Sequence, residues 1–327
     1  MSMTAAPVTI DRHAYLDTAP LRPGDRVALV SPSGPGSAES LERAVSYYRA
    51  WGLEVSVGAH VLTPHPRASY LAGEDALRRD DLVQAWLDPE VDAVICIRGG
   101  YGAMRLLDEI DWDAMRAAAA RPDGRPKLLT GSSDITALHE AFRAHLDVPT
   151  LFCPMAGNDV FRDSSAIRTD VHRWLFEPWR GRSIVGPQTE VLVPGTASGR
   201  FTGGNLSLLA AAVGAPESAP DAGILFLEDI DEELYRLDGL MVQLQRGGRL
   251  DAASAIVLGS WYRCGELAEI RALMSEYLQD LGAPVLWEQG FGHDPNALSV
   301  PLNVDGVLEA ARVGGAAAVR FEVGAEG

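Results

Sequence analysis

The chain has 327 residues, of which 47% are hydrophobic and 22% charged, and its 28 Lys and Arg against 45 Asp and Glu give a net charge of −17. This composition is ordinary for a packed protein of about two domains, and it excludes a disordered or fibrous chain. The acidic balance and the lack of a basic run argue against a nucleic-acid or anionic-membrane partner, because both bind through clustered cations.

The N-terminal stretch, residues 1–13, has no basic start followed by an apolar core, so we expect no secretory signal. The longest uncharged stretch near the middle, residues 201–216, is too short and too rich in glycine to span a bilayer. Cys96, Cys153 and Cys264 are far apart and form no CxxC pair, which excludes a zinc ribbon and a disulfide framework. We therefore expect a cytoplasmic protein.

Short apolar runs alternate with amphipathic segments in the first half of the chain. A helix is predicted to begin after Ser37 and to end at Gly52. The other predicted elements are strands at 27–31, 53–57, 92–97, 127–131 and 149–152 and helices at about 74–87 and 134–146. Alternating strands and helices imply βαβ units and a parallel sheet, whose ligands bind in loops at the carboxyl ends of the strands.

The second half is less regular. Its predicted elements are strands at 224–227, 255–259 and 284–287, a helix at about 232–246, and small β structure over 298–323. Between the halves, residues 166–190 contain Pro178 and Pro187 and are interpreted as a linker. The sequence thus predicts an α/β protein with an N-terminal domain over 14–165 and a C-terminal domain over 191–327.

Three loops of small residues follow predicted strands, at 32–36, 98–102 and 131–134. We expect them to converge, because the carboxyl ends of parallel strands meet at one edge of the sheet. Glycines in the second loop permit close approach of backbone to a ligand, and the Gly100 N–H is suited to an oxyanion. Arg98 is suited to hold either a substrate carboxylate or a neighbouring loop.

Several cofactor motifs fail. Gly34 and Gly36 are not followed by the third glycine of a dinucleotide fingerprint, and no GxxxxGK[ST] loop exists. His139-Glu140 opens like HExxH, but Arg143 stands in the fifth position. The acidic string 228–233 lacks the glycine and spacing of a calcium loop and is more typical of a solvated turn. We expect no metal and no organic cofactor.

The loop 131–134, Gly-Ser-Ser-Asp, lies between a predicted strand and a helix, as a nucleophile elbow does. The helix N-terminus offers free N–H groups and a positive dipole end, which would stabilise an oxyanion. Two interpretations stay open at this point: a nucleophilic serine, or Ser133 as a helix N-cap. The spacing does not choose between Ser132 and Ser133.

A serine nucleophile needs a base, and the base needs an orienting acid. Of the seven histidines, His293 stands in a glycine-lined loop after a predicted strand, which suits an exposed functional imidazole or an ordinary surface histidine. Glu228 directly follows the apolar run 224–227. It is placed either to orient the base or to pair with Arg236 as structure, because a buried carboxylate needs a partner.

Taken together and in this order, the motifs resemble those of the LD-carboxypeptidase family. The resemblance spans about residues 22–311. It rests on the segments SPSG at 31–34, RGGYG at 98–102, GxSDxTAL at 131–138, PM at 154–155, GGNL at 203–206, LEDIDE at 227–232, YR at 235–236 and GH at 292–293.

The resemblance implies a Ser–Glu–His serine peptidase in which Ser133 is the nucleophile, Glu228 the orienting acid and His293 the base. The family's oxyanion hole maps to the backbone N–H groups of Gly100 and Asp134. The fold it implies joins a Rossmann-like, parallel-sheet N-terminal domain to a smaller β-rich α/β C-terminal domain. The serine would then come from one half, and the acid and base from the other.

The resemblance further implies hydrolysis of an L,D-peptide bond in a small murein tetrapeptide, with release of D-alanine during cell-wall recycling by a homodimer. Arg98, Gly99 and Asn205 are expected to contact this substrate, although Asn205 is as well placed to cap the helix that follows it.

Two alternatives stay open. One is a microcin C-type immunity peptidase that cleaves a peptidyl-nucleotide amide, and the other is a binding protein without catalysis. The chain also departs from the family pattern at Ser132, Cys153 and Gly239, where an aromatic residue or histidine, a glycine and an arginine are frequent. These departures put the substrate pocket in doubt more than the chemistry.

Overall fold

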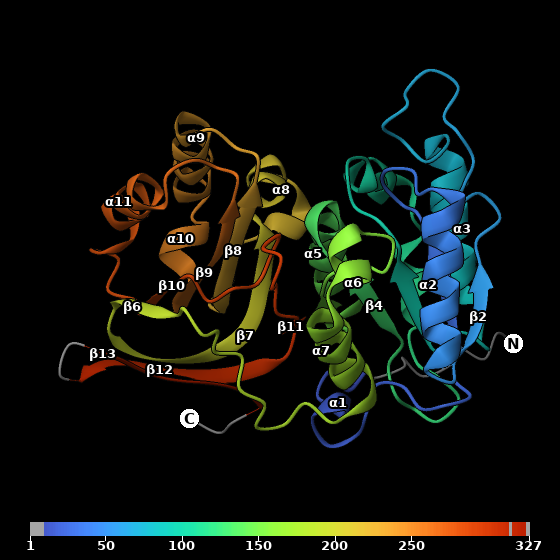
Figure 1. The fold of residues 1–327 in the computed structure, drawn as a ribbon, viewed down its shortest axis with the longest axis horizontal. Helices are drawn as coiled ribbons and strands as arrows, with labels where there is room; N and C mark the ends of the chain where they lie inside the picture. Colours follow the sequence, from blue (N-terminus) through green and yellow to red (C-terminus); the bar gives the residue numbers. More distant parts are fainter. Residues whose placement is uncertain (1–9, 314–315, 325–327) are drawn as a thin grey trace, which may run out of the picture.

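The computed structural model describes residues 10–313 and 316–324, and it has two halves that lie side by side, each built on its own sheet (Figure 1). The first sheet has the strand order β11-β5-β4-β3-β1-β2, and every neighbouring pair is parallel except β11 with β5. Its strands are β1 (Arg26–Val30), β2 (Glu54–Val57), β3 (Ala93–Cys96), β4 (Leu128–Gly131), β5 (Thr150–Phe152) and β11 (Val300–Leu302). The predicted parallel sheet is confirmed.

Helices cover both faces of this sheet, which explains why its strands are continuous apolar runs. Val27 and Leu29 share one buried cluster with α2 and α7, whereas Ala28 and Val30 share another with α3 and α5. The bounds of these helices are α2 (Ala38–Ala50), α3 (Asp75–Leu87), α5 (Thr136–Leu146) and α7 (Ser165–Phe176). Helix α7 falls in the stretch interpreted as a linker, and the predicted domain bounds stay a prediction.

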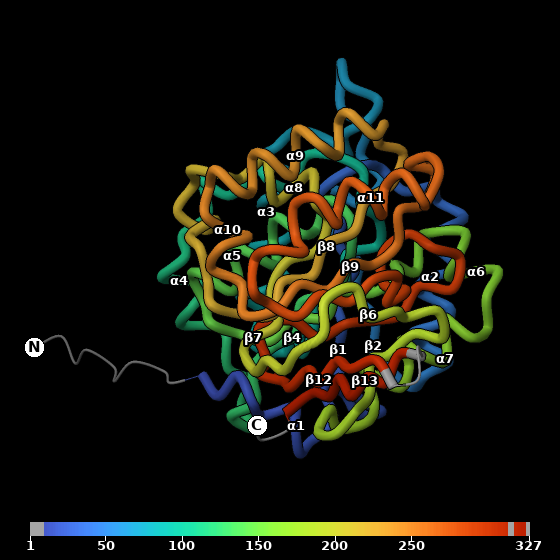
Figure 2. The backbone as a smooth tube through the Cα atoms, turned by 90° about the vertical axis from the view of Figure 1, so that its left-hand side faces the viewer, coloured from blue at the N-terminus to red at the C-terminus, as the bar shows by residue number. Residues whose placement is uncertain are grey.

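The second sheet has the order β13-β12-β7-β8-β9-β10-β6. Strands β7 to β10 are parallel neighbours, and β6, β12 and β13 join antiparallel. Helices α8, α9 and α11 lie on one side of β8 and β9, and β12 and β13 lie on the other (Figure 2). The bounds are β6 (Glu190–Val193), β7 (Gly195–Asn205), β8 (Ile224–Ile230), β9 (Ala255–Tyr262), β10 (Val285–Trp287), β12 (Asp305–Val313), β13 (Ala316–Val323), α8 (Leu206–Ala211), α9 (Leu234–Arg246) and α11 (Leu267–Leu278).

One of the three buried hydrophobic clusters of the described residues spans both halves. Phe291 packs edge-on against Phe152 at 5.7 Å between ring centroids and against Phe226 at 5.3 Å, so one ring contacts both sheets. Strand β11 adds to this connection, because it comes from the second half of the chain and pairs with β5 of the first sheet. The sequence predicts β structure in this region but not its transfer to the other sheet.

The remaining helical elements are short: α1 (Ala14–Asp17), α4 (Trp112–Ala117), α6 (Asp159–Asp163), α10 (Arg249–Ala252) and the 3₁₀ turns η1 (Ala103–Glu109), η2 (Ser133–Ile135) and η3 (Pro216–Ser218). No helix in the described part of the chain is long and apolar enough to cross a membrane.

Candidate active site

The three loops of small residues meet at the carboxyl edge of the first sheet, as the sequence predicts. The Gly34 N–H donates a hydrogen bond of 3.0 Å to the Gly99 carbonyl. A Cβ built on Gly99 would lie 3.2 Å from Ser133 Oγ and 2.9 Å from Ser133 Cβ. Residues without a side chain are therefore required for the loops to approach Ser133 this closely.

Ser133 lies at the turn between β4 and α5 in the left-handed conformation, with φ of 62°. This conformation is uncommon outside glycine and is typical of the strained turn that presents a nucleophilic serine. Ser132 is extended and 5% exposed, whereas Ser133 is half-buried. The Ser133 hydroxyl makes no hydrogen bond within the described residues, so it caps no helix. The geometry therefore favours Ser133 over Ser132 as the presented hydroxyl.

The Asp134 side chain fixes this turn from within the protein. Its carboxylate accepts a hydrogen bond of 2.5 Å from Ser33 Oγ in the first loop and one of 2.8 Å from the Ala103 N–H after the second loop. Gly100 has a φ of 110°, and its N–H donates no hydrogen bond to the described part of the chain. A free backbone donor beside a presented hydroxyl is the kind of group that binds an oxyanion.

Glu228 and His293 form a hydrogen-bonded pair in the second half. His293 Nδ1 donates to Glu228 Oε2 over 2.7 Å, with the Glu228 side chain fully buried and the imidazole 18% exposed. Burial lowers the pKa of His293, but the charge of Glu228 and its hydrogen bond outweigh this and raise the pKa above its usual value. The pair has the form of a general base and its orienting acid.

The loop that carries His293 is held by close packing. A Cβ on Gly292 would lie 2.5 Å from Glu228 Oε2, so position 292 has no room for a side chain. Ser260 Oγ accepts the backbone N–H groups of His293 at 3.0 Å and Asp294 at 3.1 Å. Glycine and serine thus set the approach of the imidazole to Glu228.

Asn205 connects the two halves of the site. Its backbone N–H donates to Thr136 Oγ1 at 2.9 Å, in the first turn of the helix that follows Ser133. Its side-chain Nδ2 donates to Glu228 Oε1 at 3.2 Å, and its Oδ1 caps α8 by accepting from the Leu208 N–H. Asn205 is 3% exposed, so the predicted capping role is confirmed, and the predicted substrate contact stays a prediction.

The other histidines are engaged elsewhere. His139 is buried, with Nε2 3.0 Å from the Gly131 carbonyl and Nδ1 2.9 Å from Thr150 Oγ1. Burial lowers the pKa of His139 to about 4, so the ring is neutral at physiological pH. The remaining five are His13 with Asp305, His60 with Asp81, His65 with the backbone N–H groups of Arg67 and Ala68, His145 stacked on Trp112 and His172 stacked on Phe176.

Glu140, next to His139, belongs to an ion cluster between the halves. Its carboxylate lies 2.8 Å from Arg249 Nη1 and 3.1 Å from Arg143 Nη2. Burial raises the pKa of Glu140, but the two guanidinium groups outweigh it and lower the pKa below its usual value. The His-Glu pair is structural, in agreement with the failed zinc motif.

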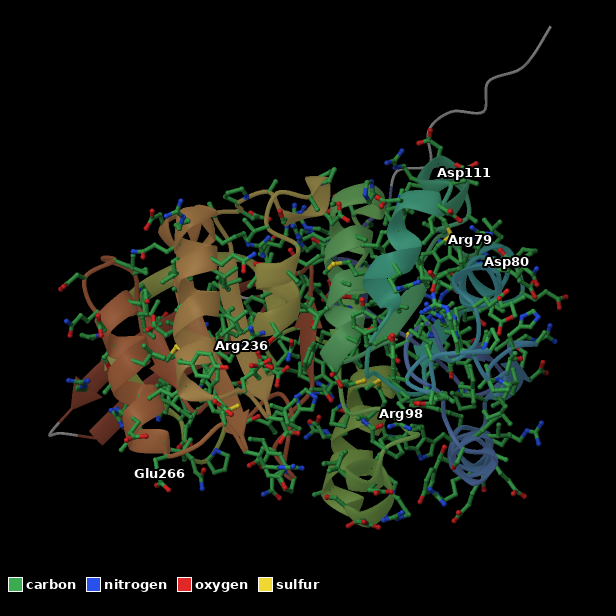
Figure 3. The ribbon with its side chains drawn as sticks, turned by 90° about the horizontal axis from the view of Figure 1, so that it is seen from above. Arg79, Asp80, Arg98, Asp111, Arg236 and Glu266 are labelled. Carbon is green, nitrogen blue, oxygen red and sulfur yellow. The ribbon has the colours of Figure 1, made fainter. Side chains whose placement is uncertain are left out.

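The two arginines considered for the site have different partners. Arg98 Nη1 donates to the Pro35 carbonyl at 2.7 Å, so it holds the neighbouring loop, which is one of its two predicted roles. Arg236 pairs with Glu232 at 3.4 Å rather than with Glu228. Seen from above, Arg98 lies on the first half and Arg236 on the second (Figure 3).

The acidic string contains a participant that the sequence analysis missed. Asp229 is 2% exposed and accepts hydrogen bonds from Asn205 Nδ2 at 2.9 Å and from Ser207 Oγ at 2.7 Å. The sequence contains one signal for the burial of Asp229: together with Glu228 it directly follows the apolar run 224–227, and a strand covered on both faces leaves little access to water for two successive side chains. Within residues 10–313 and 316–324, no three His, Cys, Asp or Glu side chains are grouped to hold a metal ion.

An open cavity of about 160 Å³ adjoins the His293 loop. Ser260 and Asp294 form part of its wall. The Ser260 hydroxyl is also the group that accepts the backbone N–H groups of His293 and Asp294. The other lining residues are Pro187, Gln188, Gly259, Glu288, Gly290, Asn296 and Leu298. Ser133, Glu228 and His293 are not among the lining residues, so the cavity adjoins the loop rather than the three candidate catalytic side chains.

Comparison with known proteins agrees with this architecture. The sequence profile of the LD-carboxypeptidase N-terminal domain matches residues 27–153, and that of the LD-carboxypeptidase C-terminal domain matches residues 198–308. The chain belongs to the LD-carboxypeptidase family. The two matched segments include Ser133 and the Glu228–His293 pair, respectively, and membership supports a peptidase role for the chain.

Named relatives are similar over most of their length. A putative carboxypeptidase of Streptomyces coelicolor is 46% identical, covering 89% of this chain and 93% of the relative. A probable murein peptide carboxypeptidase of Bacillus subtilis is 33% identical, covering 89% and 91%. The crystal structure of muramoyltetrapeptide carboxypeptidase from Oxalobacter formigenes superimposes with a TM-score of 0.75 at 26% identity, covering 92% and 99%.

Proposed function

We propose that the protein is a serine LD-carboxypeptidase that removes the terminal D-alanine from a murein tetrapeptide. The observation that carries the proposal is the buried Glu228–His293 pair, at 2.7 Å, in one fold with a presented Ser133 hydroxyl. Asn205 supports it by connecting the first turn after Ser133 to Glu228.

In the proposed reaction, His293 Nε2 takes the proton of Ser133 Oγ as the oxygen attacks the peptide carbonyl. Glu228 keeps the other ring nitrogen protonated and stabilises the charged imidazole. The N–H groups of Gly100 and Asp134 bind the oxyanion, a contribution of roughly 3 kcal/mol per donor in comparable sites. His293 then protonates the departing D-alanine, and water hydrolyses the acyl-enzyme.

The murein tetrapeptide is proposed because similar proteins are named for murein peptides and for muramoyltetrapeptide. A cytoplasmic location, where cell-wall fragments would be recycled, and a homodimer are part of the same proposal. Arg98 and Gly99 are proposed to contact the peptide from the first half.

The test is mass spectrometry of purified muropeptides incubated with the protein, looking for the loss of one terminal alanine. Ser133→Ala is expected to reduce this activity by at least about 10³-fold without unfolding the protein, because the nucleophile is removed. Ser132→Ala, a matched control on the neighbouring serine, is expected to retain activity. Unchanged hydrolysis by Ser133→Ala would reject the assignment, and cleavage of a processed peptidyl-adenylate alone would favour an immunity peptidase.

A further inference from the structure

Two successive acids of β8 accept hydrogen bonds from one amide group. Asn205 Nδ2 lies 3.2 Å from Glu228 Oε1 and 2.9 Å from Asp229 Oδ1. In a regular strand, successive side chains point to opposite faces. The pairing of β8 with β9 shifts register between Leu227 and Asp229, where two steps along β8 match three along β9, so the extra residue lies in β9. The pairing of β8 with β9 is therefore irregular at the point where both carboxylates reach Asn205.

Asp229 has no free acceptor position directed at solvent. Oδ1 accepts from Asn205 and from the Ile230 N–H at 2.9 Å, while Oδ2 accepts from the Ser207 N–H at 2.9 Å and the Ser207 hydroxyl at 2.7 Å. Asp229 is 2% exposed, so a substrate does not contact its oxygens directly. Asp229 therefore acts on the reaction through its hydrogen-bond partners and through its charge.

The surrounding charge is predominantly negative. The titratable groups that interact with Asp229 are Glu228 beside it, Cys264, His293 and, through the shared Ser207 hydroxyl, Glu232. Those that interact with His293 are Glu228, Asp229 and Asp231, with Asp294 next to it in the chain. Burial, together with the charge of Glu228, raises the pKa of Asp229 to about 6. Near neutral pH, Asp229 therefore carries a charge that favours protonated His293.

We propose that Asp229 is a positioning residue that fixes the Asn205 amide and thereby keeps the Glu228 carboxylate directed at His293. With Asn205 Oδ1 occupied by the α8 cap, Asp229 determines where the two amide protons point. Glu228 has two hydrogen bonds, one to this amide and one to His293, so a displaced amide leaves it held at one oxygen only. This inference rests on the proposed roles of Glu228 and His293.

The experiment compares Asp229→Asn with Asp231→Asn. Both changes remove one negative charge two residues apart, but the Asp231 side chain is half-exposed and pairs with Arg263 at 2.9 Å. Asp229→Asn is expected to lower kcat for D-alanine release by about tenfold, in the range seen when an orienting hydrogen-bond partner is lost. It is also expected to move the acid limb of the pH–rate profile to lower pH, because the charge that raises the pKa of His293 is gone.

Nuclear magnetic resonance titration of the His293 ring provides a readout that needs no substrate, with His293→Gln used to assign the signal. Asp229→Asn is expected to lower the pKa of His293 more than Asp231→Asn does. If the wild-type protein releases no D-alanine, the proposed function fails, whereas this titration still decides the role of Asp229. An unchanged His293 pKa and acid limb in Asp229→Asn, with loss of stability only, would overturn the proposal.

Ser207→Ala tests the same inference if Asp229→Asn does not fold. It removes the 2.7 Å hydrogen bond to Asp229 Oδ2, which lowers the pKa of that carboxyl, and leaves all charges in place. Asp229 will then protonate at higher pH, so less negative charge faces His293, and the acid limb is expected to move to lower pH, in the same direction as in Asp229→Asn but by less. An acid limb that does not move in Ser207→Ala would count against the proposal.

Discussion

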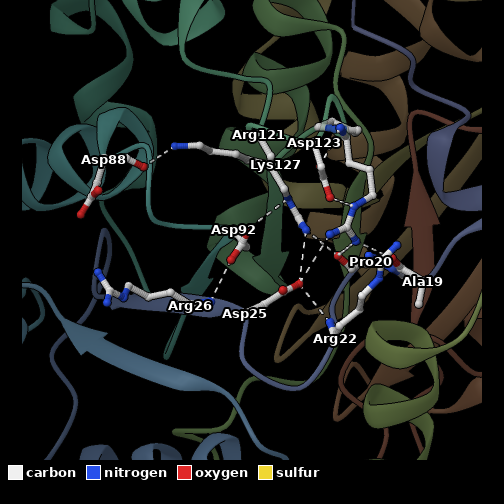
Figure 4. A network of polar contacts seen from close by, with 12 residues as sticks. Ala19, Pro20, Arg22, Asp25, Arg26, Asp88, Asp92, Arg121, Asp123 and Lys127 are labelled. Carbon is white, nitrogen blue, oxygen red and sulfur yellow. Dashed lines mark hydrogen bonds and ion pairs between the residues drawn. The ribbon is translucent and has the colours of Figure 1, made fainter.

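Buried charged side chains gather at the amino ends of the first sheet's parallel strands and at the carboxyl end of β8 in the second sheet, and the two groups differ in how their charge is compensated. At the amino ends, Arg121 donates to the Pro20 carbonyl at 2.8 Å and lies 3.5 Å from Asp25 and 3.7 Å from Asp92 (Figure 4). Lys127, beside them, donates to two backbone carbonyls. Each of these two buried cations has an oxygen partner, a carboxylate or a backbone carbonyl.

At the carboxyl end of β8, the buried charges lack such partners of opposite fixed charge. Glu228 and Asp229 lie side by side, and neither has an ion pair with Lys or Arg anywhere in the described residues. Their partners are His293 and neutral donors. Buried charge without a partner of opposite charge is unfavourable for folding. It is therefore typical of sites whose chemistry requires a group with a shifted pKa. The compensated network is thus expected to serve stability, and the uncompensated one activity.

The largest expected effect separates two histidines. His293→Ala is expected to reduce D-alanine release at least about 10³-fold, because it removes the proposed base. His139→Ala is expected to act on stability instead, by about 1–3 kcal/mol, because it leaves the buried Gly131 carbonyl without its side-chain donor. Turnover and thermal unfolding of both variants check this, and the opposite ranking of turnover would move the base to helix α5.

The next effect tests the compensated network. Arg121→Ala is expected to lower the free energy of unfolding by about 3 kcal/mol, because it leaves Asp25 and Asp92 facing each other without their shared cation. The specific activity of the folded fraction is expected to stay unchanged. Arg22→Ala is the control, since it removes the same charge from an exposed side chain in the loop before β1, three residues from Asp25, and is expected to change stability by less than about 0.5 kcal/mol. Equal losses in both variants, measured by urea unfolding, would contradict the comparison.

Much of this architecture could be predicted because local pattern and burial agree in the first half. Apolar runs such as 92–97 predict strands buried on both faces, and the structure has β3 there with helices on either side. The loops at 32–36, 98–102 and 131–134 converge because parallel strands place their carboxyl ends together. The left-handed backbone conformation of Ser133 belongs to the turn at 131–134, between β4 and α5.

The rest depends on contacts between distant residues, which no local pattern encodes. Strand β11 has three residues and contains Pro301, so only its pairing with β5 identifies it. The sequence predicts a linker where helix α7 lies, because Pro178 and Pro187 follow the helix closely. Asp229 has the sequence context of a solvated turn, and its burial depends on the irregular pairing of β8 with β9 and on Ser207, 22 residues away in the chain.

The smallest effect concerns the pH dependence of stability at the amino ends. Lys127 is 1% exposed and donates to the carbonyls of Trp86 at 2.6 Å and Asp88 at 2.5 Å. Burial lowers its pKa from 10.5 to about 8, although Asp88 and Asp92 oppose the shift. Between these two values the unfolded chain binds more protons than the folded protein, so stability rises with pH.

Wild-type protein is therefore expected to gain about 1 kcal/mol in the free energy of unfolding between pH 7 and pH 9, relative to Lys127→Met. Urea unfolding at each pH measures the difference, and groups that titrate in both proteins cancel. Activity is expected to follow an independent profile, because Lys127 and Ser133 lie at opposite ends of β4. Parallel stability curves would mean that the two carbonyls keep the amine charged, and the buried cation would then be fully compensated at every pH tested.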